Sequence, residues 1–170
     1  MTLLERLFAA APDPREALRP LWAAVVATAR APEWYRDCGV ADSLEGRFDM
    51  VSSVLALVLL RMETEPALAA RTALLAEIFV EEMDGQLRQT GVGDLMVGKQ
   101  IGRLMAALGG RVGALRAALT VGGSELEQAV HRNITLADET RAHAVAERLR
   151  ALADRLAATG ADALLAGKIA

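Results

Sequence analysis

The chain has 170 residues, of which 53% are hydrophobic and only 4% aromatic. This length and composition are typical of one folded helical domain and exclude a disordered protein. With 22 acidic and 19 basic residues, the net charge of −3 argues against general nucleic-acid binding. The positive mean hydropathy leaves open an exposed apolar surface for a partner or a membrane.

The N-terminal part predicts two helices. Residues 2–10 can form a short amphipathic helix. The charged pair Glu5–Arg6 interrupts its apolar stretch, whereas a signal peptide has an uninterrupted one. We therefore expect a cytoplasmic protein. Asp13, Pro14 and Glu16 have the arrangement of an N-cap, a first helical residue and a capping box, whereas Pro20 should kink this helix or delay its start. Its predicted buried residues are Leu18, Leu21, Trp22, Val25 and Ala29.

Residues 34–62 predict a short turn followed by a buried central helix. Residues 34–40 indicate a turn or a single helical turn that Gly39 stops. Asp42 and Ser43 have the pattern of a helix cap. The next helix is apolar on two faces, which places it inside the fold, and at about 15 residues it is too short to span a bilayer. One face carries Phe48, Val51, Leu55, Leu59 and Met62, and the other carries Met50, Val54 and Leu57.

The following segments also have helical periodicity. A helix is predicted from about Pro66 to about Thr90, where Gly91 provides a left-handed stop. Asp94 is expected to cap the next helix, and Gly109–Gly110 is expected to break it.

The C-terminal part completes an all-helical pattern. Gly122–Gly123 should end another helix, and Ser124 begins a capping box for the helix that follows. The last long helix is predicted over residues 138–158, with Gly160 as its end. No segment has the alternation of a strand. The sequence therefore predicts an all-α fold, a single compact helical domain of about eight helices over residues 1–170.

Two sets of residues could carry chemistry. His143 lies between Glu139 and Glu147 at four-residue spacing, which would place three metal ligands on one helical face. That face is opposite the apolar one, so an exposed polar stripe is the favoured interpretation. Cys38 has no histidine base nearby, which favours a buried or half-buried thiol over a nucleophile. We predict no catalytic residue, no metal site and no cofactor.

An acidic helix face is the next candidate. Glu77, Glu81 and Asp84 share one face, but metal sites of helical bundles also need a Glu-x-x-His motif on other helices, and the sequence has none. A solvated or partner-facing surface is favoured. Asp84 and Arg88 have the spacing of an ion pair one turn apart.

A basic stretch with a strip of small residues follows. Between Asp94 and Glu125 the chain has no acidic residue, so this stretch could meet an acidic partner or anionic lipid headgroups, although a solvated helix face is the simpler interpretation. Gly98, Gly102 and Ala106 form a flat strip that would let another helix approach closely, either inside the fold or in a partner. The basic residues of the stretch are Lys99, Arg103, Arg111 and Arg116.

Two motifs carry a family resemblance. The first is W-Y-R-D-C-G-V-A-D-S-L-E-G-R-F-D-M at 34–50, and the second is E-E-M-D-G-Q-L-R-Q-T-G-V-G-D-L-M-V-G-K at 81–99. In this order they resemble the ubiquinol–cytochrome c chaperone family, whose members are assembly factors of the cytochrome bc complex. The resemblance covers about residues 34–115.

This resemblance implies a function and a set of partners. It implies a non-enzymatic chaperone that binds newly made cytochrome b and assists assembly of ubiquinol–cytochrome c reductase. A peripheral contact with the anionic cytoplasmic face of the inner membrane is compatible with the basic stretch. The residues predicted to bind a partner are Trp34, Tyr35, Arg47, Asp49, Asp84, Arg88, Asp94, Gly98, Lys99, Gly102 and Arg103.

Three alternatives remain open from the sequence. The chain could be a small helical enzyme or a metal- or metabolite-binding protein that uses the acidic face. It could be a structural homodimer whose exposed apolar surface is the subunit interface. Within the motifs, some charged residues could form an internal polar network instead of a binding surface. These residues are Arg47, Asp49, Asp84, Arg88 and Asp94.

Overall fold

The computed structural model describes residues 13–89 and 94–169, without the side chains of 86–89, 94–97, 99 and 100. The predicted helix at 2–10 and the connector at 91–93 lie outside this description. The elements are η1 (Glu16–Leu18), α2 (Arg19–Ala29), α3 (Pro32–Arg36), α4 (Leu44–Glu63), α5 (Pro66–Ala69), α6 (Thr72–Gln89), α7 (Asp94–Val121), α8 (Glu125–Asn133), η2 (Glu139–Arg141), α9 (Ala142–Ala158) and α10 (Ala161–Leu165).

These elements confirm the all-α fold, and their number is close to the predicted one. Among the described residues the only extended pairing is an isolated antiparallel bridge between Val40 and Leu136. It joins the loop before α4 to the loop after α8. Two backbone hydrogen bonds reinforce it, from the amide of Ala41 to the carbonyl of Thr135 at 2.9 Å and from that of Ala137 to the carbonyl of Gly39 at 2.8 Å.

Helix α4 is the central helix, as predicted. It packs against α2, α6, α7 and α9, and every residue from Asp49 to Leu59 is buried. The predicted cap is confirmed, because Ser43 Oγ accepts a hydrogen bond from the Gly46 amide at 3.2 Å. A side chain at Gly46 would place its Cβ 2.0 Å from the carbonyl oxygen of Ala41, so the loop before α4 can pass this closely only over glycine.

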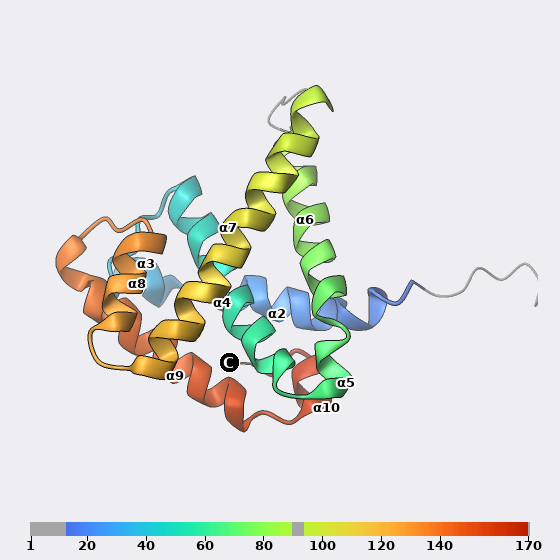
Figure 1. Cartoon of the computed structure of the whole chain (residues 1–170). Helices are drawn as coiled ribbons and strands as arrows, with labels where there is room; N and C mark the ends of the chain where they lie inside the picture. Colours follow the sequence, from blue (N-terminus) through green and yellow to red (C-terminus); the bar gives the residue numbers. More distant parts are fainter. Residues whose placement is uncertain (1–12, 90–93, 170) are drawn as a thin grey trace, which may run out of the picture.

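The helices α6 and α7 form two arms that extend beyond the rest of the molecule (Figure 1). In the same view α8 and α9 lie on one side of α4 and α7, and α2 crosses behind them. The lower half of α7 packs on α4 and α8, whereas its first turns contact α6.

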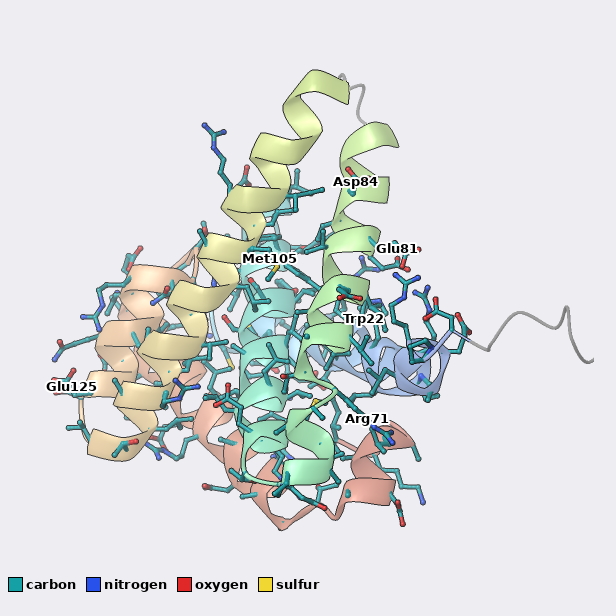
Figure 2. The ribbon with its side chains drawn as sticks, turned by 45° about the vertical axis from the view of Figure 1, so that its right-hand side comes forward. Trp22, Arg71, Glu81, Asp84, Met105 and Glu125 are labelled. Carbon is teal, nitrogen blue, oxygen red and sulfur yellow. The ribbon has the colours of Figure 1, made fainter. Side chains whose placement is uncertain are left out.

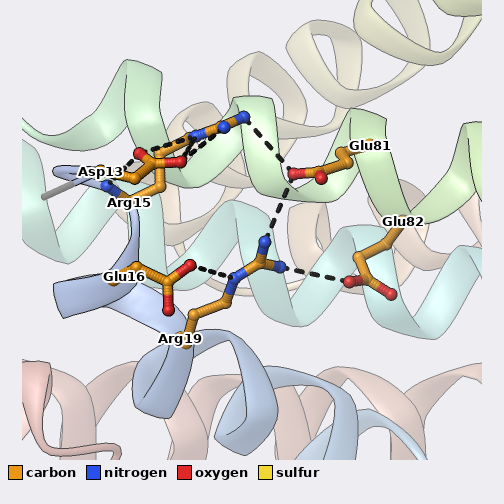
Figure 3. Close-up of polar contacts among 6 residues, drawn as sticks. All are labelled: Asp13, Arg15, Glu16, Arg19, Glu81 and Glu82. Carbon is orange, nitrogen blue, oxygen red and sulfur yellow. Dashed lines mark hydrogen bonds and ion pairs between the residues drawn. The ribbon is translucent and has the colours of Figure 1, made fainter. Parts of the chain in front are cut away.

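Two arginines at positions 15 and 19 form ion pairs with α6 (Figure 3). Arg15 and Arg19 each lie 3.4 Å from Glu81, and Arg19 lies 3.2 Å from Glu82. Pro20 delays α2, which begins at Arg19 after one 3-10 turn, in agreement with one of the two predicted outcomes. Glu81, on the acidic face of α6, is therefore paired with arginines of the same chain.

Three predicted boundaries were wrong. The helix expected from Pro66 onward is divided into α5 and α6, with a turn at Ala70–Arg71. Gly109–Gly110 does not break α7, because the burial of residues on its opposite face outweighs the weak helix propensity of two glycines. Ser124 forms no capping hydrogen bond, and the chain reverses instead through Gly122 and Gly123, with φ of +76° and +61°.

Candidate functional site

The aromatic residues of the first motif close the junction between α2 and α3. Trp34 is buried, and its indole N–H donates to the Thr28 carbonyl at 2.8 Å. The guanidinium of Arg148 lies 5.1 Å from the centroid of the Trp34 ring. The half-buried Tyr35 donates its hydroxyl to the Ala29 carbonyl at 2.9 Å. Both predicted binding residues thus have their polar atoms engaged inside the chain.

Asp49, at the end of the first motif, is the centre of a buried polar network. One carboxylate oxygen accepts a hydrogen bond from Arg111, and the other accepts from the amide and the hydroxyl of Thr135 at 2.9 and 2.7 Å. Arg111 also donates to the Asn133 carbonyl at 2.8 Å and lies 5.4 Å from the Phe48 ring centroid. Burial lowers the pKa of Arg111, and the nearby Asp49 opposes that shift. This network joins α4, α7 and the loop after α8.

Arg111 was not expected in this network. Arg111 and Arg116 were predicted to contribute to an electropositive surface, but Arg111 is 8% exposed and Arg116 pairs with Glu63 at 2.5 Å. The helical periodicity of the sequence could have indicated that Arg111 is buried. Arg111 lies three residues after the buried Leu108 and four before the buried Leu115, so all three share one face of α7.

Arg47 and Asp84, the other predicted network residues whose side chains the structure describes, form no hydrogen bond with Asp49 or Arg111. Arg47 is exposed and donates its Nε to Asp42 at 2.7 Å, which lowers the pKa of that carboxyl group. Asp84 is half-buried on α6, and Figure 2 shows it toward the outer end of that helix. The side chains of Arg88 and Asp94 lie outside the description.

One face of α7 is apolar, built of small residues and open. Gly98, Gly102 and Ala106 are exposed, so of the two alternatives for the strip the structure does not support packing inside the described fold, and Met105 is 42% exposed. Figure 2 marks Met105 on this arm. A Cβ added at any glycine of the face would meet no neighbouring atom within 4 Å. The glycines of α7 are Gly98, Gly102, Gly109, Gly110 and Gly113.

These positions form a continuous surface along the helix. On an idealised helix, residues 98, 102, 105, 106, 109 and 113 fall within an arc of about 100°. The buried Leu108 and Leu115 lie on the other side. Arg103 is exposed at the edge of the face, whereas the side chain of Lys99 lies outside the described residues. The structure therefore brings Gly98, Gly102 and Arg103 together on one arm and places Trp34 and Tyr35 elsewhere.

Helix α7 is unusually exposed for its apolarity. By length and composition alone, Ile101–Val121 is able to cross a membrane, a criterion that core helices of soluble proteins also meet. Only 22% of its most apolar window is buried, in contrast to the fully buried middle of α4. A large apolar surface that the fold leaves uncovered is typical of an interaction site.

The candidate metal and nucleophile positions have other roles. His143 lies 3.4 Å from Glu127, and His131 lies 2.9 Å from Glu139. No group of three or more His, Cys, Asp or Glu side chains is arranged to hold a metal within the described part of the chain. Cys38 is buried, which raises the pKa of its thiol and keeps it protonated.

Comparison with known proteins identifies the family. The family model described as ubiquinol-cytochrome C chaperone matches residues 36–170. No curated protein matches the chain. A solved structure, the crystal structure of the Cbp3 homolog from Brucella abortus, has a TM-score of 0.79 and 33% sequence identity over 91% of this chain and 88% of that chain. Since the family model spans most of the sequence and the fold agrees with that structure, the chain belongs to the ubiquinol–cytochrome c chaperone family.

Proposed function

We propose that this protein is a non-enzymatic assembly chaperone that binds newly made cytochrome b and assists assembly of ubiquinol–cytochrome c reductase. Membership of the chaperone family supports the general role. The observation that carries the proposal is the open face of α7, which is apolar and built of small residues on a projecting arm. We further propose that the protein acts at the cytoplasmic side of the inner membrane.

The chemistry of this face suits an apolar helix of the client. Small residues let two helix backbones approach closely, so that van der Waals contacts extend along several turns. The glycines at 98, 102, 109 and 113 supply a shallow path of this kind, and Met105 adds a flexible apolar side chain that adapts to irregular partners. Docking would cover apolar surface of the client that is otherwise exposed to water.

The test uses a glycine pair that differs only in position. Gly109 lies on the α7 face, and Gly85 lies exposed on α6; a Cβ at either meets open space. Gly109→Leu should obstruct a docked helix, whereas Gly85→Leu changes helix propensity and side-chain size equally without touching the face. Each tagged variant is purified from gently solubilised membranes of its host, with cytochrome b scored by mass spectrometry and haem by absorbance.

The two variants should differ in the amount of cytochrome b that co-purifies with them. The natural chain and Gly85→Leu should recover cytochrome b without the other subunits of the mature complex, and Gly109→Leu should recover much less cytochrome b. Recovery of only the protein itself by the natural chain would contradict the proposal. A concentration-independent dimer that Gly109→Leu disrupts would instead assign the face to a homodimer.

A further inference from the structure

A second surface, distant in sequence from α7, is an open cavity with three arginines around it. The cavity has a volume of about 690 Å³ and is lined by residues from the end of α2, from α3 and from the start of α4. This volume is in the range of small-ligand sites. Its lining residues are Arg30, Pro32, Tyr35, Arg36, Asp42 and Arg47.

The guanidinium groups of this cavity are only partly neutralised. Arg30 forms no ion pair with any residue that the structure describes. Arg47 donates a hydrogen bond from its Nε to Asp42 at 2.7 Å. The two terminal guanidinium nitrogens form no hydrogen bond with the residues that the structure describes. Arg36 is more fully engaged, because its Nε and one terminal nitrogen both bind Asp37 at 2.7 Å.

The charge of the lining favours an anion. Three arginines and Asp42 give a net charge of +2, and including Asp37, the partner of Arg36, lowers it to +1. A phosphate group carries one or two negative charges and matches the planar fork of arginine. Burial raises the pKa of Tyr35, and Arg47 and Arg30 lie near enough to its hydroxyl to oppose that rise.

The fold holds the cavity in shape without help from a ligand. Tyr35 is fixed by its hydrogen bond to the Ala29 carbonyl, and both Tyr35 and Pro32 line the cavity. Asp42 orients the guanidinium of Arg47 by accepting a hydrogen bond from its Nε, so that the terminal nitrogens remain available to a ligand. Such preorganisation reduces the entropy that binding would cost.

We propose that this cavity binds a phosphate group through Arg30 and Arg47, with Arg36 adding charge at its edge. The phosphate could belong to a phospholipid headgroup or to a soluble phosphate compound, and both offer the same chemistry to the arginines. The proposal does not depend on cytochrome b binding. It also differs from the predicted lipid contact at the basic stretch, where Arg111 and Arg116 are engaged inside the protein.

The test compares two double variants with the same loss of charge. Arg30→Gln with Arg47→Gln removes the two available cations of the cavity. Arg71→Gln with Arg155→Gln removes two exposed arginines elsewhere, on the turn before α6 and on α9. Binding of inorganic phosphate is measured by calorimetry, and co-sedimentation is measured with phosphatidylcholine vesicles that contain or lack phosphatidylglycerol. Circular dichroism confirms that each variant is folded.

The cavity variant should bind phosphate about a hundredfold more weakly than the natural chain, since it loses a hydrogen bond from each of two arginines and each loss weakens binding by about tenfold. The control variant should bind as the natural chain does. Loss of vesicle binding in the cavity variant alone would identify a headgroup, and loss confined to free phosphate would identify a soluble compound. Equal weakening in both variants, or no measurable binding by the natural chain in either assay, would overturn the proposal.

Discussion

At the scale of single residues, the buried pair of Asp49 and Arg111 is the contact on which the first motif depends most. Removing one partner of a buried ion pair leaves the other charge uncompensated and costs about 3–5 kcal/mol. Asp49→Ala should therefore lower the free energy of unfolding by about that amount in urea denaturation. Replacing both partners, as in Asp49→Leu with Arg111→Met, should cost less than the sum of the single changes.

The exposed pair of Arg47 and Asp42 provides the control for that experiment. Arg47→Ala should change the free energy of unfolding by less than about 1 kcal/mol, because exposed ion pairs contribute little. If Asp49→Ala were as mild as Arg47→Ala, the buried network would not be a determinant of stability.

A second prediction at this scale concerns acid. Hydrogen bonds from Arg15 hold the pKa of Asp13 at about 2, below its usual 3.8. Because the folded-state pKa is depressed, the pair stabilises the fold above pH 3.8 and loses this contribution as the pH falls toward 2. The melting-temperature difference between the natural chain and Asp13→Asn should thus shrink over this interval. A difference independent of pH would show that the pair does not contribute.

At the scale of elements, α7 is a continuous helix through two glycines. Gly110 is exposed within it, so Gly110→Ala should raise the free energy of unfolding by about 1 kcal/mol. Gly122, with φ of +76°, is the matched contrast, because an alanine there is strained and should destabilise the protein. Destabilisation by Gly110→Ala in thermal melts would instead indicate a break at Gly109–Gly110.

At the scale of the whole molecule, the features that could be predicted from the sequence are those that depend on the pattern of residues along a single helix. The two apolar faces of α4 identified the central helix, whereas the small-residue strip on α7 gave an open face only as one of two alternatives. The continuity of α7 and the burial of Arg111 were not predicted, because both depend on contacts with distant segments. Arg111 is buried only because Asp49, 62 positions before it, and Asn133 supply its hydrogen bonds.

The same limit explains the acidic face of α6. Spacing along the helix showed that Glu81 is on a common face with other acids, but not that Arg15 and Arg19 would reach it from the start of the chain. The residues that line the cavity beside Tyr35 all lie between positions 30 and 47, but they come together only because the chain turns between α2, α3 and α4. Sites that one helix presents were visible in the sequence, and sites assembled between elements were not.

Photo-crosslinking in the native host is the most direct test of the proposed docking of cytochrome b on the outer face of α7. A photoreactive amino acid is placed at Ala106, on this face, and in a matched strain at Ala157, which is also exposed, on α9. We predict that cytochrome b is crosslinked from position 106 and not from position 157. Crosslinks from position 157 alone, or none from either while the chaperone still co-purifies with cytochrome b, would contradict docking on α7.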